Sequence, residues 1–589
     1  MPHTPRLVIG PVLRRVVGTR ATIWVETSAP VLVRVHAGAA RGEAPTFTAY
    51  GHHYALVLVD GLTPDAVVPY EVWLDDTQVW PLADSPYPPS VLRTRPADDG
   101  DQPVRLVFGS CRESTQHASA RRLPPDALDA YARRLAADVP AARDWPDLLV
   151  LLGDQVYADE TSPKIRRWLR RRPRRHDAPQ DQVVTFEEYS KLYLESWRAD
   201  TEIRWLLSTL PSVMIFDDHE IIDDWNTSAP WRAGMRAQPW WAERITSGLA
   251  SYWVYQHLGN LSPEQIAVDP VYAKVIAAGD ATTVLRDFAA RVDQESDVGH
   301  DPQRWAAAEY QWSYALDIGR TRLIVLDNRC SRVVEPGHRA MLPRGEWQWF
   351  SDQAYGRYDH LVVGSSLPWL LPPAVHHLEA WNERLADSPR PWVARASERL
   401  RQAVDLEHWA AFGRSFRQLA ELFADLGAGA ARPGGTVGVD AGAPASISVL
   451  SGDVHHSYVA RAEFGDRVTS PVHQLTCSPL HNQVPAAMRP VLRLGWARAA
   501  DAIARALSRT AGLPRPAVRW RRLAGPYFGN AVSTLVHDGR SARVAIEGTA
   551  KDGQLFTVAD VPLAGGTPPA GAPRQGVSSD ATPASEQVA

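Results

Sequence analysis

The sequence has few features that would place it outside the cytoplasm or within a membrane. It has only three cysteines, Cys111, Cys330 and Cys477, too few and too scattered for a disulfide framework, which fits a reducing compartment. The segment that begins at Met1 lacks both the basic region and the long apolar core of a signal peptide. There is no run of about eighteen apolar residues, so no helix is expected to cross a bilayer. We therefore expect a cytoplasmic protein.

The chain also lacks a large excess of charge of either sign. Its formal net charge is −4 over 589 residues, which gives no clear nucleic-acid or membrane signal. The hydrophobic fraction of 45% and the charged fraction of 22% are typical of a globular protein. Because the chain is longer than one hydrophobic core usually serves, we expect two or more lobes.

The first part of the chain has the composition of a β-domain. Runs rich in β-branched and aromatic residues occur at 21–25, 31–35, 54–59 and 68–73, and turn residues separate them. This pattern predicts an all-β sandwich of the immunoglobulin or fibronectin kind over residues 1–95. The segment contains no cluster of candidate ligands, so we interpret it as a packing or spacing module.

The rest of the chain changes to a strand, loop and helix pattern, which predicts an α/β domain over residues 104–560. We expect helical insertions at 161–210, 227–312 and 372–445, and we interpret the last as peripheral packing rather than a cover over the active site. Residues 565–589 are rich in Pro, Ala, Gly and Ser and are expected to be disordered.

An arginine-rich run at 166–175 interrupts the α/β pattern. It is slightly more typical of a solvated basic excursion than of a functional element. The alternative is a lid that draws in anions, because arginine pairs with phosphate through two hydrogen bonds.

An amphipathic helix is predicted at 492–507. Its apolar face should be part of the core, because a helix usually packs such a face against the protein. The residues on that face are Trp496, Ala500, Ile503 and Leu507.

The most informative stretch is residues 148–157. Five consecutive apolar residues at 148–152 predict a buried strand. Gly153 allows the backbone to turn, and Asp154 emerges at the carboxyl end of the strand, where open α/β sheets place their chemistry. Tyr157 follows closely, and a carboxylate with a phenolate suits a hard cation. Alone, the pattern is equally typical of a strand followed by an ordinary turn.

Three further apolar runs, at 104–108, 213–216 and 447–450, also end in residues that could bind metal. Asp327 and Asn328 follow another predicted strand, but turn chemistry alone explains them. Because four strands end in this way, we interpret the pattern as one metal site. The candidate residues after the three runs are Cys111, Arg112, Asp217, Asp218, His219, Glu220, Asn226, Asp453, His455 and His456.

In combination, the motifs Gly-Ser-Cys, Gly-Asp-x-x-Tyr, Asp-Asp-His-Glu and Gly-Asp-x-His-His resemble those of the PhoD-like alkaline phosphatases, within the calcineurin-like metallophosphoesterases. The resemblance covers roughly residues 1–560 and is weakest in the insertions. It implies a metallophosphoesterase-like four-layer α/β/β/α sandwich with two or more metal ions between the sheets. The β-domain precedes this sandwich in the sequence.

The resemblance also implies roles for individual residues. Asp154 would bridge two metals, Tyr157 and Cys111 would bind ferric iron, and His219 would assist the reacting phosphate. The expected ions are Fe³⁺ with Ca²⁺, and other divalent metals remain open. Further ligands would be Asp218, Asp453 and His455, with Asn226 as an added ligand or phosphate contact.

These expectations together predict a metal-dependent phosphohydrolase that cleaves phosphate monoesters or diesters of small phosphorylated substrates by in-line attack of a metal-activated water. Arg112 is a candidate phosphate clamp, although a surface arginine would fit the sequence equally well. Two alternatives are a phosphodiesterase for nucleic acid or phospholipid and a metal-binding scaffold without turnover. The physiological substrate and the oligomeric state stay open.

Overall fold

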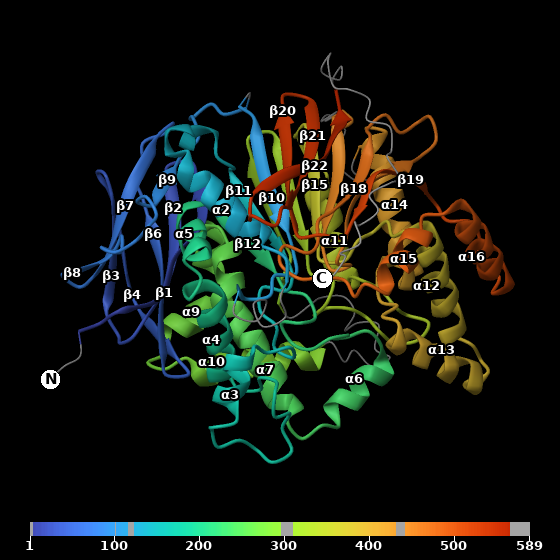
Figure 1. Ribbon diagram of the computed structural model, residues 1–589, viewed down its shortest axis with the longest axis horizontal. Helices are drawn as coiled ribbons and strands as arrows, with labels where there is room; N and C mark the ends of the chain where they lie inside the picture. Colours follow the sequence, from blue (N-terminus) through green and yellow to red (C-terminus); the bar gives the residue numbers. More distant parts are fainter. Residues whose placement is uncertain (1–3, 101, 116–122, 296–309, 432–441, 566–589) are drawn as a thin grey trace, which may run out of the picture.

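The computed structural model describes residues 4–100, 102–115, 123–295, 310–431 and 442–565. Its N-terminal part is a sandwich of two antiparallel sheets (Figure 1). One sheet has the order β1 (Leu7–Val17), β2 (Arg20–Thr27), β6 (His52–Val59) and β5 (Phe47–Ala49). The other has the order β4 (Ala40–Pro45), β3 (Leu32–Ala37), β7 (Val67–Leu74) and β8 (Thr77–Trp80), and β9 (Val91–Arg93) pairs with β7.

This sandwich packs tightly against the remainder of the protein. Arg14 is fully buried, and its guanidinium donates to the backbone oxygen of Gln256 at 2.6 Å and to Oδ1 of Asn260 at 3.0 Å. Glu26 accepts from the hydroxyl of Tyr255 at 3.0 Å. Because buried polar groups that lose their partners are costly, these contacts fix the N-terminal sandwich to the helices beside it.

Two large mixed sheets form the centre of the protein. The six-stranded sheet has the order β12 (Ser212–Ile215), β11 (Leu148–Leu152), β10 (Val104–Gly109), β20 (Ala531–Asp538), β21 (Ser541–Thr549) and β22 (Leu555–Ala564). The seven-stranded sheet has the order β13 (Tyr314–Ile318), β14 (Thr321–Leu326), β15 (His360–Ser365), β16 (Ser446–Ser451), β18 (Val472–Thr476), β17 (Ser457–Glu463) and β19 (Arg519–Tyr527). The strands that lead to the candidate ligands, β10, β11, β12 and β16, pair in parallel within their sheets.

The two sheets pack face to face, and helices cover both outer faces, which confirms the predicted four-layer α/β/β/α sandwich. Leu152 and Leu450 belong to one buried cluster between the sheets. On the outer face of the seven-stranded sheet, Ile324 packs with side chains of α11 (Arg344–Ala354) and α14 (Gly413–Gly427). On the outer face of the six-stranded sheet lies α2 (Ala127–Ala137), which η1 (Val139–Asp144) follows.

The three segments that we expected as helical insertions are largely helical. Between β11 and β12 lie α3 (Pro163–Leu169), α4 (Phe186–Tyr193), η2 (Leu194–Arg198) and α5 (Thr201–Thr209). The next group contains α6 (Ala229–Arg236), α7 (Trp241–Tyr252), η3 (Trp253–His257), η4 (Leu258–Asn260), α8 (Pro263–Val268), α9 (Pro270–Ala277) and α10 (Thr282–Glu295). The third contains α12 (Pro373–Ala386), α13 (Pro391–Ala403) and η6 (Trp409–Ala411).

The predicted amphipathic segment forms two helices, α15 (Met488–Leu494) and α16 (Arg498–Thr510). The prediction that its apolar face is core is wrong for Ile503, whose exposed fraction is 72%. Within the described residues, no helix combines the length and apolar character that a membrane crossing requires. The tail predicted to be disordered lies outside the described residues, apart from Gly565.

Candidate metal centre

The candidate ligands converge where strands of both sheets end. Cys111 follows β10, Asp154 follows β11, Asp218 follows β12 and Asp453 follows β16. Within the six-stranded sheet, the backbone N–H of Cys111 donates to the oxygen of Gly153 at 3.2 Å. Across the two sheets, the backbone N–H of Asp453 donates to the Ser110 hydroxyl at 3.1 Å. The strand order therefore assembles one site from four distant parts of the chain.

Several of these loop residues have a backbone conformation that residues other than glycine rarely adopt. Cys111, Asp154, Asp453 and His455 have φ angles of 57°, 54°, 64° and 49°. Left-handed residues of this kind cost free energy and concentrate at functional sites, where the surrounding structure holds them. Here they turn the chain sharply at the strand ends.

The two glycines of the Gly-Asp motifs are required by close approach between loops. A Cβ atom on Gly153 would lie 2.5 Å from Cβ of Asp217, and one on Gly452 would lie 1.9 Å from Oγ of Ser110. Glu220 adds a clamp, because its carboxylate accepts from the backbone N–H groups of Asp154 at 3.0 Å and Asp217 at 2.8 Å. These contacts explain the motif glycines without any ligand.

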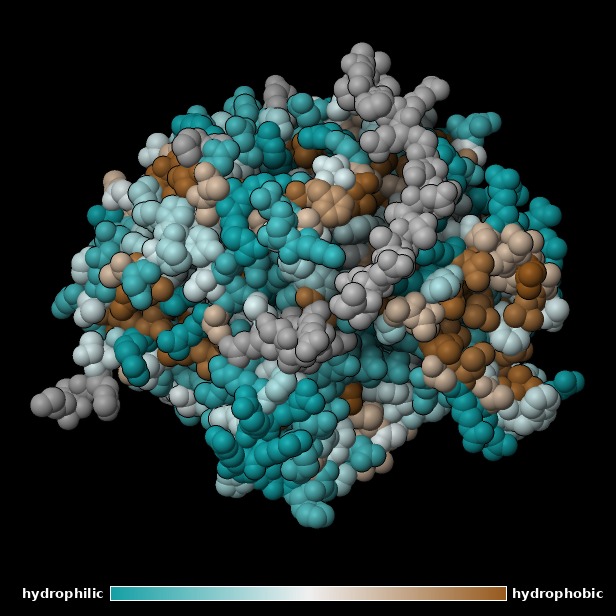
Figure 2. Space-filling view, in the orientation of Figure 1, coloured by the Kyte–Doolittle hydropathy of each residue, from teal (hydrophilic) through white to brown (hydrophobic). Residues whose placement is uncertain are grey.

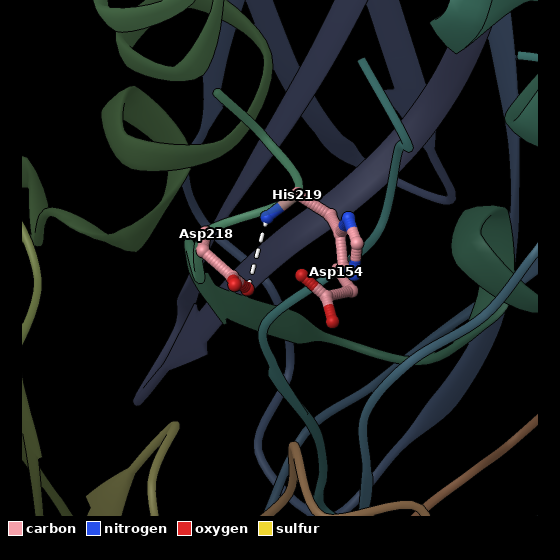
Figure 3. Close-up of side chains that lie close together, drawn as sticks. All are labelled: Asp154, Asp218 and His219. Atoms are coloured by element: carbon pink, nitrogen blue, oxygen red, sulfur yellow. Dashed lines mark hydrogen bonds between the residues drawn. The ribbon is translucent and has the colours of Figure 1, made fainter. Parts of the chain in front are cut away.

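Carboxylates form two overlapping groups at this point. The ligand atoms of Asp154, Asp218 and His219 lie within 4.8 Å of one another, and so do those of Asp217, Asp218 and Asp453. Figure 3 shows the first group, in which the side chains converge and the backbone N–H of His219 donates to Asp218 at 3.0 Å. Asp218 belongs to both groups. Asp217 was a candidate because it follows a predicted strand, but it was not among the ligands that the family resemblance implies.

A buried arginine that sequence reasoning missed lies among these carboxylates. Arg329 is fully buried and forms ion pairs with Asp217 and Glu407, and with Asp218 at 3.4 Å and Asp453 at 3.6 Å. Burial alone would lower its pKa, but the four carboxylates raise it well above the usual value. The only sequence signal was its place directly after the pair Asp327 and Asn328, which we had explained by turn chemistry.

The carboxylates still lack enough positive charge and enough hydrogen-bond partners. Burial, together with neighbouring acidic groups, raises the pKa of Asp154 and Asp217 well above the usual range for a carboxyl. One oxygen each of Asp154, Asp217 and Glu407 is buried without a hydrogen-bond partner. Buried polar atoms are nearly always paired, and buried charges need compensation. Metal cations therefore fit this set of residues.

The predicted iron ligands lie beside the same carboxylates. Cys111 is fully buried, and its sulfur accepts from the Ser478 hydroxyl at 3.2 Å. The Tyr157 hydroxyl accepts from the amide of Asn482 at 3.1 Å. Burial, and then the charge of Asp154, raises the pKa of both the thiol and the phenol well above their usual values. A cation would reverse this effect, because it stabilises the deprotonated ligand.

His219 is held by a carboxylate that sequence reasoning did not single out. Its Nδ1 lies 2.9 Å from Oδ1 of Asp159, and its ring centroid lies 4.7 Å from that of Tyr157. Burial favours the neutral ring, but Asp159, Asp218 and Asp154 raise the pKa of His219 well above its usual value. Asp159 therefore fixes the orientation of the ring and favours its protonated form.

The third insertion reaches the site, and our interpretation of it as peripheral packing is wrong. Nε2 of His408 lies 2.9 Å from Oδ2 of Asp453, and its Nδ1 lies 2.8 Å from Oε1 of Glu379. Glu407, the residue before it, pairs with Arg329. No local pattern in the sequence signals these contacts, since they join residues 45 and 78 positions apart.

The predicted site residue Asn226 has its polar groups engaged by the protein itself. The amide nitrogen of Asn226 donates to the backbone oxygen of Arg329 at 3.1 Å, and its Oδ1 accepts from Arg232 at 3.2 Å. Asn226 therefore positions the Arg329 loop. His455 is half-buried, two residues beyond Asp453, whereas His456 is buried and its pKa falls to about 4 because of burial.

Arg112 is buried and faces a second acidic group. Its guanidinium pairs with Asp126 at 2.8 Å, Asp200 at 2.6 Å and Asp129 at 3.3 Å. These contacts do not support the prediction that Arg112 clamps the phosphate. They favour a structural ion-pair network behind the metal centre.

We expect Arg112→Gln to cost about 3–5 kcal/mol of stability, because it leaves buried carboxylates without their cation. Metal content and KM of the folded fraction should stay normal. Arg112→Lys is the matched control, since it keeps the charge and should lose less stability. Urea unfolding measures the stability, and steady-state kinetics measure KM. A raised KM at unchanged stability would instead support the prediction that Arg112 binds the phosphate.

The comparisons with known proteins agree with this fold. Residues 119–283 match the model of the PhoD-like phosphatase family, and residues 4–92 match a domain of unknown function, DUF7800. Among solved structures, that of PhoD matches with a TM-score of 0.55 at 13% identity, covering 96% of this chain and 94% of that one. A maltogenic amylase from S. marinus matches at 9% identity over 94% of this chain and 81% of that one, but its TM-score of 0.17 carries no argument. No curated protein sequence matches significantly.

Proposed function

We propose that the chain is a metal-dependent phosphohydrolase of monoesters, diesters or both, since residues 119–283 match the model of the PhoD-like phosphatase family. One observation carries the proposal. The buried Oδ1 of Asp154 has no hydrogen-bond partner, although it lies where two acidic groups and a histidine converge. A cation at this atom would supply the missing partner.

The donor set favours two kinds of metal ion. Cys111 and Tyr157 offer a thiolate and a phenolate, which suit ferric iron, and they lie near Asp154. Asp217, Asp218 and Asp453 offer only hard carboxylate oxygens, which suit calcium. We therefore propose Fe³⁺ with Ca²⁺. When bound, the metals would lower the pKa of a water molecule and neutralise charge on the phosphate.

Three residues of the chain have further roles in the proposed reaction. Asp159 favours the protonated form of His219, which can donate a proton to the leaving alkoxide or a hydrogen bond to a phosphate oxygen. Arg329 keeps Asp217 and Glu407 in fixed positions, because its guanidinium pairs with both. His408 similarly orients Asp453.

The first expected result is that the purified protein contains at least two metal ions per chain, one of them iron. Thiolate or phenolate bound to ferric iron should give a visible charge-transfer band. Elemental analysis, together with turnover of nitrophenyl phosphate and bis-nitrophenyl phosphate, tests the metals and separates monoesterase from diesterase. A metal-free yet fully active protein would contradict the proposal, and a metal-loaded protein without turnover would favour the scaffold.

The arginine-rich run offers a second test. Arg172 pairs with Glu187, and Arg174 pairs with Glu188 at 3.0 Å, whereas Arg170 and Arg171 are exposed. We expect Arg170→Gln with Arg171→Gln to raise KM roughly two- to fivefold for anionic substrates at low salt, since exposed charges attract ligands over a distance that salt screens.

The effect of this double variant should vanish at high salt, with kcat unchanged. Arg143→Gln is the matched control, because this exposed arginine pairs with Asp65 beside the N-terminal sandwich. Steady-state kinetics across a salt series measure the effect. A fall in kcat at constant KM would instead assign the run to the chemistry.

A further inference from the structure

An apolar and basic surface, which we call the α15–α16 surface, lies at one edge of the protein. Figure 2 shows hydrophobic residues gathered at the right-hand edge, where Figure 1 places α12, α13 and α16. On α15, Met488, Val491 and Leu494 are spaced by three residues, so they share one helix face. Their exposed fractions are 48%, 54% and 61%, and that of Ile503 on α16 is 72%.

The charge of this segment differs from that of the whole chain. Residues 488–522 contain nine arginines and one aspartate, a net charge of +8, against −4 for the whole chain, so the remainder carries −12. The single acidic residue, Asp501, pairs with Arg505 and lies 3.4 Å from Nε2 of His377. Arg498 and Arg509 are exposed, so the positive charge faces solvent.

A basic cavity adjoins the same helices. It has a volume of about 420 Å³ and lies between α12, α14 and the residues that follow α16. Its two acidic groups are engaged, because Asp387 pairs with Arg339 at 3.0 Å and Glu383 accepts from the backbone N–H of Gly413 at 3.1 Å. The exposed arginines that line it are Arg384, Arg414, Arg417 and Arg515.

We propose that the α15–α16 surface docks onto an anionic lipid bilayer. The aliphatic side chains would enter the boundary between headgroups and acyl chains, and the arginines would pair with lipid phosphates. The adjoining cavity has the size and charge to hold one phosphate headgroup. Neither the apolar face nor the net charge alone carries this inference; their coincidence on one surface does.

Other occupants fit the surface less well. Single-stranded nucleic acid is bound by stacking its bases on aromatic side chains, but the exposed apolar residues of α15 and α16 are aliphatic. A second copy of the chain would bring two surfaces of the same sign together, which electrostatic repulsion opposes. A bilayer offers both the apolar interior and the opposite charge.

The surface also lies close to the metal centre. The guanidinium of Arg493 lies 5.2 Å from the ring centroid of Phe528, and that ring lies 5.7 Å from the ring of His456, three residues beyond Asp453. Docking would therefore hold the metal centre next to the membrane. The inference does not depend on the proposed hydrolysis, because its test measures binding.

Co-sedimentation of the full-length protein with vesicles tests the proposal. We expect binding to vesicles of phosphatidylcholine mixed with phosphatidylglycerol but not to phosphatidylcholine alone, and salt should weaken it. Leu494→Ser with Ile503→Ser should lose about tenfold or more in affinity, because two exposed aliphatic side chains no longer enter the bilayer. Arg498→Gln with Arg509→Gln should lose a similar factor.

The matched control is Val268→Ser on α8, which removes an equally exposed apolar side chain far from α15 in sequence and should bind normally. Metal content and circular dichroism of each variant verify folding. Equal binding by wild type and both double variants would overturn the proposal. So would binding to an oligonucleotide but not to vesicles, or a dimer in solution that Leu494→Ser with Ile503→Ser dissociates.

Discussion

Replacing Asp154 with alanine is expected to remove both metal ions and to lower turnover more than about 10³-fold, because metal ions supply several kcal/mol of transition-state stabilisation. The family resemblance assigns Asp154 a bridging role, and its buried Oδ1 has no other partner. Asp218 belongs to both acidic groups, so Asp218→Ala should have an effect of the same order. Elemental analysis and kcat measure both variants.

Stability separates a metal ligand from an ordinary buried carboxylate. Burial and the neighbouring acidic groups raise the pKa of Asp154, so its charge destabilises the metal-free fold. After chelation, Asp154→Asn should therefore melt at a higher temperature than wild type, whereas in the presence of metal it should melt at a lower one.

Asp129→Asn is the matched control, a buried carboxyl beside Arg112 whose pKa burial raises to about 9. It lies outside the proposed metal centre, so this variant should keep both metals. Normal metal content in Asp154→Ala would refute the bridging role.

The strand ends were the part of the site that the sequence could predict. Apolar runs such as 148–152 are strands buried on both faces, and parallel strands place their carboxyl ends at one edge of a sheet. Asp154, Asp218 and Asp453 therefore meet even though 299 positions separate the first from the last. The apolar runs, together with the rule that parallel strands place their carboxyl ends at one edge of a sheet, are enough to predict that these carboxylates meet.

Contacts from the insertions could not be predicted in the same way. His408 and Glu407 reach the carboxylates from the segment between α13 and η6, and no periodicity relates that segment to β16. The position of Arg329 directly after Asp327 and Asn328 suggested only a turn. Its partners, such as Asp217, lie on other loops, so the local sequence does not indicate them. Only tertiary packing brings these charges together, so a single sequence carries no signal for them.

The α15–α16 surface illustrates a different limit. The periodicity of 492–507 predicted an amphipathic helix, and α16 is one, but the pattern does not identify what covers its apolar face. We assigned that face to the core, yet Ile503 is 72% exposed. The net charge of −4 for the whole chain likewise does not reveal the net charge of +8 over residues 488–522, because an excess of acidic residues elsewhere cancels it.

The largest effect expected without loss of metal is that of His219→Ala. A positioned proton donor typically contributes about 10²–10⁴-fold to turnover, so kcat should fall by that factor while both metals stay bound. The ring lies beside Asp218 and Asp154, and Asp159 favours its protonated form. The loss should be smaller for nitrophenyl esters, because a good leaving group needs no proton.

Asp159→Asn is the companion variant for His219→Ala. The amide keeps a polar contact to Nδ1 of His219 but removes the charge that raises the pKa of the imidazole. The acidic group in the pH profile of kcat should therefore titrate at lower pH, and activity at alkaline pH should fall more than activity at neutral pH. Metal content, melting temperature and the pH profile are measured on one preparation. Metal lost together with activity in His219→Ala would make His219 a ligand, and full activity in that variant would exclude it from the reaction.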